Sequence, residues 1–537
     1  MIIAIVTTLI AYRTYGTYVA GVLRLNDENS TPAHTHEDGV DFVPSSRPVV
    51  LGHHFASIAG AGPIVGPIIA ISFGWLPAFI WILVGSIFIG AVHDFTSLVA
   101  SIRHRGRTIS DIVEDYVGVT AKRLFVLFAF AALLLVIGVF TDIVARTFEA
   151  KPEVATTSAA FVALAFAYGF FTRKFAIHVV PATIVGLAGL AGCVWLGTIA
   201  PIQADWSLWV GVTLAYVGVA AVIPVWALLQ PRDYLNSYLL YAMLGAGILG
   251  LFVTAPTIQI EAFTGLRHEQ LGPMFPILFV TVACGAISGF HSLVASGTTS
   301  KQIDRETDAK FIGYGGMLLE AVLAVLALIA AGVATTAGHS AALADAGPIA
   351  IFSNGVGGFM TALGLPLEIA ISFVALAVSA FALTSLDTCT RLARLLFSEF
   401  FSTRETRDSL KRPGLLANRY FATAIVVALG AGLTFTKSFS AAWPVFGAAN
   451  QLLAALALLA VAVWLAKLGR NNLFVVVPMF FMFAVTVVAL GQLILKNFAD
   501  GNIVLTAIAA TLLALGLVLL VLALGVLRPT KVTGEHA

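Results

Sequence analysis

The sequence predicts an all-α polytopic membrane protein. Of its 537 residues, 59% are hydrophobic and only 11% are charged, and the mean hydropathy is +0.96. Soluble domains carry about 25% charged residues, so most of this surface cannot face water. The apolar stretches are long and do not alternate in polarity as the strands of a membrane barrel would. We therefore expect helices that cross a lipid bilayer. The net charge of +2 gives no indication of a nucleic-acid partner.

Apolar runs of about 20 residues can cross a bilayer as helices, because each residue covers 1.5 Å of roughly 30 Å of hydrocarbon. About fifteen runs meet this length, and no polar stretch between them is long enough for a soluble domain. We therefore expect one integral membrane domain over residues 1–537. The expected spans lie near 2–23, 50–72, 75–101, 123–147, 155–172, 176–199, 208–229, 236–256, 274–297, 311–336, 367–394, 419–435, 441–466, 472–496 and 503–527.

Basic residues in alternate loops predict the orientation, since cytoplasmic loops carry an excess of Lys and Arg. All of them share one side only if the Gly-rich piece 347–361 does not cross, so we expect 337–366 to be a short extracellular or re-entrant segment. The N-terminus then lies outside and the C-terminus in the cytoplasm, with a basic cytoplasmic loop over 395–418. These basic residues are Arg103, Arg105, Arg107, Lys122, Arg123, Arg173, Lys174, Arg232, Lys301, Arg305, Lys310, Arg391, Arg394, Arg404, Arg407, Lys411, Arg412, Arg528 and Lys531.

The second expected span contains a segment that favours a broken helix. Residues 52–67 hold two histidines, four glycines and two prolines, and both glycine and proline interrupt helices. Unpaired backbone at membrane depth is tolerated where it lines a cavity, as in many transporter sites. Close packing through small residues is the alternative. The expected binding residues are His53, His54, Ser57, Gly60 and Gly62, with Pro63 and Pro67 shaping the break.

A second segment, 284–299, has a similar character. Both segments contain Gly-x-His followed after five residues by Gly, at Gly52 and at Gly289. The expected topology runs the first segment outward and the second inward, as inverted repeats require. We therefore expect an inverted-repeat core whose halves start near 50–72 and 274–297. The second half is expected to contribute Ser288, Gly289, His291 and Ser296 to binding.

Ionisable residues inside expected spans usually face a cavity or a partner. A carboxylate buried in hydrocarbon can bind and release a proton near neutral pH, which suits a proton-coupled carrier. The candidates are Glu320 and Asp387 first, then Asp94 with His93. For Asp387 the alternative is an ion pair with Arg391 or Arg394, one or two helical turns later.

Other polar residues leave two questions open. The hydroxyls of Thr384 and Ser385 could serve a sodium ion, so the coupling ion is a proton or sodium. The stretch 230–234 is expected to be a cytoplasmic turn with an ion pair, either a gate latch or a plain connection. Helix packing is the expected role of two late amides. The residues concerned in gating and structure are Arg232, Asp233, Arg391, Asn450 and Gln451.

The sequence does not favour an enzyme. It contains no GxSxG, Walker A or HExxH motif, so an intramembrane enzyme and a passive channel are minor alternatives. Cys193, Cys284 and Cys389 are far apart and fit neither a disulfide framework nor a zinc site. We therefore expect no cofactor and no bound metal. The sequence predicts no oligomeric state.

Several of these segments together resemble the carbon starvation protein A family, in order along the chain. The resemblance implies a bacterial inner-membrane transporter of the amino acid–polyamine–organocation type, with two inverted five-helix repeats, extra helices inserted between them, and uptake of peptides or of pyruvate with protons. The matching segments are 38–44, 52–67, 228–235, 283–299, 312–320, 386–391 and 443–454.

The chain departs from that family in three places. It lacks an additional N-terminal helix, its 337–366 region is short, and His93 stands before Asp94 where relatives carry Gln. The resulting prediction is a secondary transporter that imports small carboxylates such as pyruvate, with short peptides as the alternative substrate class. A carboxylate suits the amide-rich N-termini of half-helices.

Overall fold

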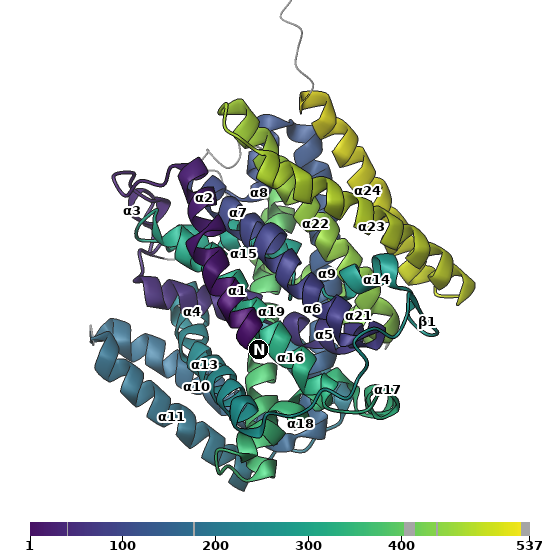
Figure 1. Ribbon diagram of the computed structural model, residues 1–537. Coiled ribbons are helices and arrows are strands. Elements are labelled where there is room, and N and C mark those ends of the chain that lie inside the picture. Colours follow the sequence, from purple (N-terminus) through teal and green to yellow (C-terminus); the bar gives the residue numbers. More distant parts are fainter. Residues whose placement is uncertain (40, 176–177, 402–413, 437–438, 528–537) are drawn as a thin grey trace, which may run out of the picture.

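The computed structural model describes residues 1–537 except 40, 176–177, 402–413, 437–438 and 528–537. The described chain is a bundle of helices with one short hairpin (Figure 1). In the hairpin, β1 (Arg267–His268) pairs antiparallel with β2 (Gly272–Pro273), so that Arg267 lies opposite Pro273.

Two interrupted helices lie at the centre. The first consists of α4 (Arg47–Ile58), α5 (Gly62–Ala70) and the 3₁₀ turn η1 (Ile71–Phe73), with a bend of 44° at the break. Pro63 cannot donate a backbone hydrogen bond, so it ends α4 but fits the first turn of α5. The second consists of α14 (Met274–Thr281) and α15 (Gly289–Gly297), separated by residues 282–288.

Long helices surround these two. The helix α6 continues into α7 through the π-helical turn η2 (Ser86–Gly90), and the π-helical turn η5 (Lys310–Tyr314) leads into α16. The long inner helices are α6 (Trp75–Gly85), α7 (Ala91–Arg103), α9 (Val119–Ala150), α13 (Leu229–Thr254), α16 (Gly315–Gly332), α19 (Leu367–Phe401) and α22 (Phe439–Lys467).

Burial separates inner from outer helices. The apolar stretch of α22 is 100% buried, whereas those of α1–α2 and α24 are 28% buried, so the latter present apolar side chains outward. These surfaces suit lipid. The outer helices are α1 (Ile2–Arg13), α2 (Tyr15–Leu23), α10 (Pro152–Lys174), α11 (Val179–Ile199), α12 (Trp206–Val222), α21 (Arg419–Phe435), α23 (Leu473–Ala499) and α24 (Ile503–Leu527).

A strap formed by residues 24–39 and 41–46 crosses one end of the bundle, which we call the strap end. It pairs with the segment after α15: the amide of Val43 donates to the Lys301 carbonyl at 3.1 Å, and the amide of Ser45 donates to the Gln302 carbonyl at 3.0 Å. Nε2 of His34 lies 2.8 Å from an Asp304 carboxylate oxygen. The short elements at or near this end are α3 (Pro32–Thr35), α8 (Ile109–Tyr116), η3 (Val225–Ala227), η4 (Thr299–Lys301) and η6 (Leu415–Ala417).

The opposite end is hollowed by a cavity of about 860 Å³, the vestibule. Its walls come from the end of α9, the hairpin, α17 (Thr336–Asp345), α18 (Gly347–Thr361) and the start of α19. Figure 1 shows α17 and α18 at the end of the bundle away from α2 and α3. The helix α4 begins at the strap end, where Arg47 lies 3.6 Å from Asp308, and α5 leads to Ser72 at the vestibule. The chain from α14 to α15 runs the other way.

The predicted fold class is confirmed: the described chain is mostly helical, and eleven helices are long and apolar enough to cross a membrane, or twelve with the bent pair. The expected spans near 208–229 and 419–435 are the shorter apolar helices α12 and α21, and the span near 274–297 is interrupted. The count of about fifteen and the inverted repeat stay predictions.

Two further expectations concern loops. The piece 347–361 is α18, a helix of 15 residues packed beside α19 and α13. The expected basic loop 395–418 begins inside α19, which extends to Phe401. Six of the basic residues used for orientation lie outside the described residues: Arg404, Arg407, Lys411, Arg412, Arg528 and Lys531.

A glycine at the crossing of the interrupted helices gives a stability prediction. A Cβ on Gly66 would lie 2.6 Å from the carbonyl oxygen of Thr281 and 3.1 Å from Cα of Val282, both backbone atoms that cannot yield easily. Overpacking costs about 1–3 kcal/mol, so Gly66→Ala should lower the apparent Tm of the purified protein in detergent. Gly245→Ala in α13 is the matched control, since nothing lies within 4 Å of its Cβ. Equal Tm values for the two variants would contradict this packing.

Candidate functional site

The breaks of the two interrupted helices lie against each other. A Cβ on Gly62 would collide with the side chain of Cys284, and a Cβ on Gly285 would lie 3.6 Å from Cα of Pro63. Only a hydrogen at Gly62 permits its approach to Cys284, while the approach of Gly285 to Pro63 is an ordinary van der Waals contact. The crossing is therefore a place where helix ends from both halves of the chain meet in the interior.

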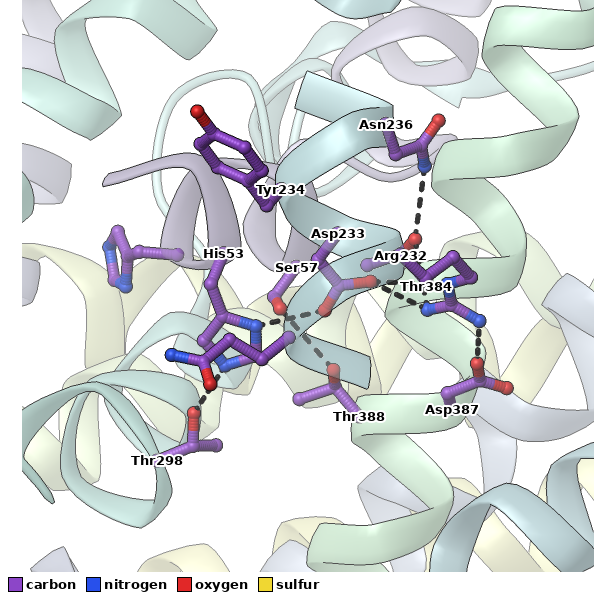
Figure 2. A network of polar contacts seen from close by, with 12 residues as sticks. His53, Ser57, Arg232, Asp233, Tyr234, Asn236, Thr298, Thr384, Asp387 and Thr388 are labelled. Carbon is purple, nitrogen blue, oxygen red and sulfur yellow. Dashed lines mark hydrogen bonds and ion pairs between the residues drawn. The ribbon is translucent and has the colours of Figure 1, made fainter. Parts of the chain in front are cut away.

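A buried network centred on Arg232 links α13 to α19 and α4 (Figure 2). Its guanidinium donates to Asp233 at 2.7 Å and also forms an ion pair with Asp387. The side chains of all three residues are 2% exposed or less. Tyr216 of α12 contacts the guanidinium and donates to Asp387 at 2.8 Å. The charge of Arg232 is thus neutralised by carboxylates on two helices.

His53 joins the Arg232 network to the second half of the chain. Its Nδ1 lies 2.8 Å from Asp233, and its Nε2 lies 2.8 Å from the hydroxyl of Thr298, just past α15. Figure 2 shows His53 between these two partners. His53 thereby connects the two carboxylates and the guanidinium of this network to the end of α15.

Thr384 and Ser385 of α19 already have partners. The Thr384 hydroxyl accepts from Arg232 and from Asn236, each at 3.1 Å. The Ser385 hydroxyl donates to the carbonyl of Ser57 at 2.8 Å, and the Ser57 hydroxyl lies 3.3 Å from that of Thr388. These contacts hold α19 against the end of α4, just before its break.

A second buried group, the carboxylate–histidine cluster, lies among α4, α7, α15 and α16. Asp94 is its centre: one carboxylate oxygen lies 2.7 Å from Nδ1 of His93, and the other lies 2.9 Å from Nδ1 of His291. Nε2 of His291 lies 3.5 Å from Glu320. His54 contacts the hydroxyl of Thr299 at 2.9 Å and lies beside Gly316, one turn before Glu320.

Glu320 is completely buried, and within the described parts of the chain no donor forms a hydrogen bond to either of its carboxylate oxygens. The Nε2 atoms of His54, His93 and His291 also lack hydrogen-bond partners there. Buried polar groups usually have partners. Such a concentration of unsatisfied proton-binding atoms is typical of a functional site rather than of packing.

Two amides brace the second break. Oδ1 of Asn450 accepts the backbone amide of Phe290 at 2.9 Å, and Nδ2 of Asn450 donates to the Ser288 hydroxyl at 2.9 Å. The side chain of Gln451 donates to the Phe279 carbonyl at 2.6 Å. These contacts hold α22 against both ends of the interrupted helix and leave little room beside Gly289.

The structure corrects two expectations about charged residues. The alternative ion pair of Asp387 with Arg391 or Arg394 is wrong, because Asp387 pairs with Arg232, while Arg391 lies one turn nearer the strap and reaches Asp41 and the Ile223 carbonyl. The expected turn over 230–234 is also wrong: these residues are the first turns of α13, and Arg232 is 1% exposed.

Ser296 lies away from the break. Its hydroxyl bonds within α15 and accepts from the backbone amide of Ile109. Tyr216, Asn236, Thr298 and Thr299 were missed, although each is a polar group inside or beside an apolar run. The candidate residues predicted from the sequence therefore fall into four groups: His53, Arg232, Asp233, Thr384 and Asp387 in the Arg232 network; His54, His93, Asp94, His291 and Glu320 in the carboxylate–histidine cluster; Ser57, Gly60, Gly62, Pro63, Pro67, Ser288, Gly289, Ser385, Asn450 and Gln451 in or beside the interrupted helices; and Ser296 and Arg391 toward the strap end.

The fold is that of a helical protein with many candidate membrane spans. The structure is similar to that of the manganese transporter of Eremococcus coleocola: the crystal structure of one mutant of that protein gives a TM-score of 0.53 at 14% identity, covering 91% of this chain and 98% of that one. A likeness at this identity shows the fold. Among the described residues, no group of three His, Cys, Asp or Glu side chains is arranged to hold a metal ion.

The chain belongs to the carbon starvation protein CstA family, whose model matches residues 1–341 and 332–489. It is 33% identical to the Peptide transporter CstA of Bacillus subtilis over 96% of this chain and 94% of that protein, and 33% identical to that of Escherichia coli over 86% and 76%. It is 36% identical to the Pyruvate/proton symporter BtsT of Escherichia coli, over 60% of this chain and 47% of that protein. The chain is therefore a transporter of this family and not an enzyme.

The Arg232 network gives a prediction about stability. Removing the guanidinium takes away the arginine charge that Asp233 and Asp387 share, and breaking a buried ion pair typically costs about 3–5 kcal/mol. Arg232→Met should therefore lower the Tm of the purified protein far more than Arg267→Met, which removes an exposed guanidinium at the hairpin. Adding Asp387→Asn to Arg232→Met should restore part of the loss, because it removes one uncompensated charge. A Tm for Arg232→Met equal to that of Arg267→Met would contradict this role.

Proposed function

We propose that this transporter imports a small carboxylate such as pyruvate together with protons, by alternating access. The carboxylate–histidine cluster carries the proposal. It places Glu320, a buried carboxyl to which no described residue donates a hydrogen bond, 3.5 Å from His291 and in one cluster with Asp94, His54 and His93. Burying an unpaired charge is costly, so a proton is the simplest ion for such a group to take up and release.

The substrate carboxylate is proposed to bind at the crossing. The helix α5 begins at Gly62 and α15 begins at Gly289, so two helix N-termini point into the same region. Helix N-termini carry unpaired amides and a partial positive charge, which favour an anion. The hydroxyls of Ser57 and Ser288 lie on the flanking turns and would complete the site.

Protons are favoured over sodium as the coupling ion. The two hydroxyls that could bind sodium are engaged, since Thr384 accepts from Arg232 and Ser385 donates to the Ser57 carbonyl. Because the guanidinium of Arg232 and the amide of Asn236 both donate to the Thr384 oxygen, that oxygen is already occupied as an acceptor. No metal or other cofactor is part of this proposal.

The orientation follows from the positions of the basic residues. The strap end carries Arg103, Arg107 and Lys301, so by the excess of basic residues in cytoplasmic loops it is proposed to face the cytoplasm of a bacterial inner membrane. The chain then starts outside and ends inside. The open vestibule and the paired strap correspond to an outward-facing state.

A second candidate is the uptake of short peptides. The vestibule volume of about 860 Å³ favours it, since pyruvate is far smaller than this space. Relatives with each substrate name support both candidates. Proteoliposomes with an imposed inward proton gradient distinguish them: uptake of labelled pyruvate that a protonophore abolishes supports the first, and uptake of a labelled dipeptide alone supports the second.

Glu320→Gln tests the coupling role. The amide cannot exchange a proton, so gradient-driven accumulation of labelled pyruvate in proteoliposomes should fall at least tenfold, while exchange of internal for external pyruvate without a gradient should persist. The matched control is Glu261→Gln, a carboxyl outside the cluster on the exposed segment before the hairpin. Full gradient-driven accumulation by Glu320→Gln would contradict the assignment.

Alternating access requires the strap to release. Ser45 and Ile303 face each other in a parallel bridge, so Ser45→Cys with Ile303→Cys should form a disulfide that holds the strap end closed. Uptake should be lost under oxidising conditions and regained with a reductant, and each single variant serves as control. Undiminished uptake by the cross-linked protein would overturn the strap as a moving gate.

A further inference from the structure

Aromatic side chains connect the wall of the vestibule to the break of the first interrupted helix. Trp443 lines its floor, and its ring centroid lies 5.3 Å from that of Phe446, which lies 6.1 Å from Phe140. Phe140 in turn packs on the break, where a Cβ on Gly60 would lie 2.8 Å from the ring. A chain of three aromatic rings thus runs from the wall of the vestibule to the break of the first interrupted helix.

Charges of both signs reach this space from different elements. Lys151 follows the end of α9, Asp345 ends α17, and Glu368 lies in the first turn of α19. No ion pair joins any of these three to another residue in the part of the chain that the structure describes. In contrast, Asp142 and Arg146 of the same wall pair with each other at 2.8 Å.

The positions of these three residues favour a ligand that carries both a positive and a negative group. Asp345 lies in the last turn of a helix, where unpaired carbonyls add negative potential. Together with Glu368 it provides a place for an ammonium group, and Lys151 provides one for a carboxylate. The hydroxyl of Ser353 lines the same cavity, is 3% exposed, and has no hydrogen-bond partner among the described residues. A buried polar atom without a partner indicates a missing one.

We propose that the vestibule is an outer docking site for short peptides, which bind with the amino terminus at Asp345 and Glu368 and the carboxylate at Lys151. Its volume of about 860 Å³ falls in the range of ligand pockets, about 300–1,000 Å³. A monocarboxylate has no group for the acidic side, so it gains nothing there from those two residues. This inference rests on the second candidate function, uptake of short peptides, and on a vestibule that faces the outside.

Equilibrium binding of labelled dialanine to the purified full-length protein tests the site. Asp345→Asn with Glu368→Gln should weaken binding about tenfold, which is about 1.4 kcal/mol, and Lys151→Gln should weaken it to a similar extent. N-acetylated dialanine lacks the ammonium group, so its weaker binding should not respond to the acidic pair. Asp500→Asn, an exposed carboxyl in the turn after α23, is the matched control.

In proteoliposomes the same double variant should raise the KM for dialanine about tenfold and leave the KM for pyruvate unchanged. Failure of native protein to bind dialanine would overturn the docking site. Equal effects of the variant on acetylated and free dialanine would also overturn it, because a general surface charge would then be responsible. If Glu320→Gln abolishes coupled uptake while the vestibule variants change neither binding nor uptake, the docking site is overturned and the proposed transport function stands. Absence of all uptake by native protein would instead contradict the proposed function.

Discussion

A guanidinium that has no access to water must be neutralised by carboxylates within a few ångströms, and this requirement ties together the interior of the protein. Arg232 meets it with Asp233 on its own helix and Asp387 on α19. Because the cost of an uncompensated buried charge is several kcal/mol, α13 and α19 cannot separate there unless another partner takes over. His53 and Thr298 extend the constraint to α4 and to the end of α15. Both interrupted helices are thereby attached to one charged centre.

Consecutive histidines on α4 connect the two buried groups. Successive residues of a helix point about 100° apart, and here His53 contacts Asp233 while His54 contacts Thr299 and packs beside Gly316. A movement of α4 therefore alters the Arg232 network and the carboxylate–histidine cluster together. Proton occupancy in the cluster and the charged contacts that hold the helices are thus coupled mechanically through one helix.

The sequence was sufficient to predict features that depend on local composition. Residues 52–67 combine helix-breaking residues within one apolar span, and Glu320 is an ionisable group in an otherwise apolar run, so both were identifiable without knowledge of the fold. The partners of such groups were not identifiable from the sequence. Arg232 and Asp387 are separated by 155 positions and Tyr216 and Asp387 by 171. Pairing at such a distance leaves no periodic signal in the chain.

The error at 230–234 has a related cause. A proline flanked by polar residues is typical of a turn, but Pro231 occupies the first turn of α13, where its missing amide has no cost. The local sequence therefore places Arg232 at the surface, because it gives no sign of the buried carboxylate partner, Asp387 on α19. The vestibule was likewise not predictable, since elements from distant parts of the chain, from α5 to α22, enclose it.

The strap also has a consequence for how the protein is made. Glu306, which is completely buried, accepts the amide of Asn26, 280 positions earlier in the chain. At synthesis rates of about 5–20 residues per second, the strap emerges roughly 15–60 s before its partner exists. During that time the first interrupted helix has no second break to cross. Until then, groups of the first half that bond to the second, such as the amide of Asn26 and the guanidinium of Arg103, have no partner there.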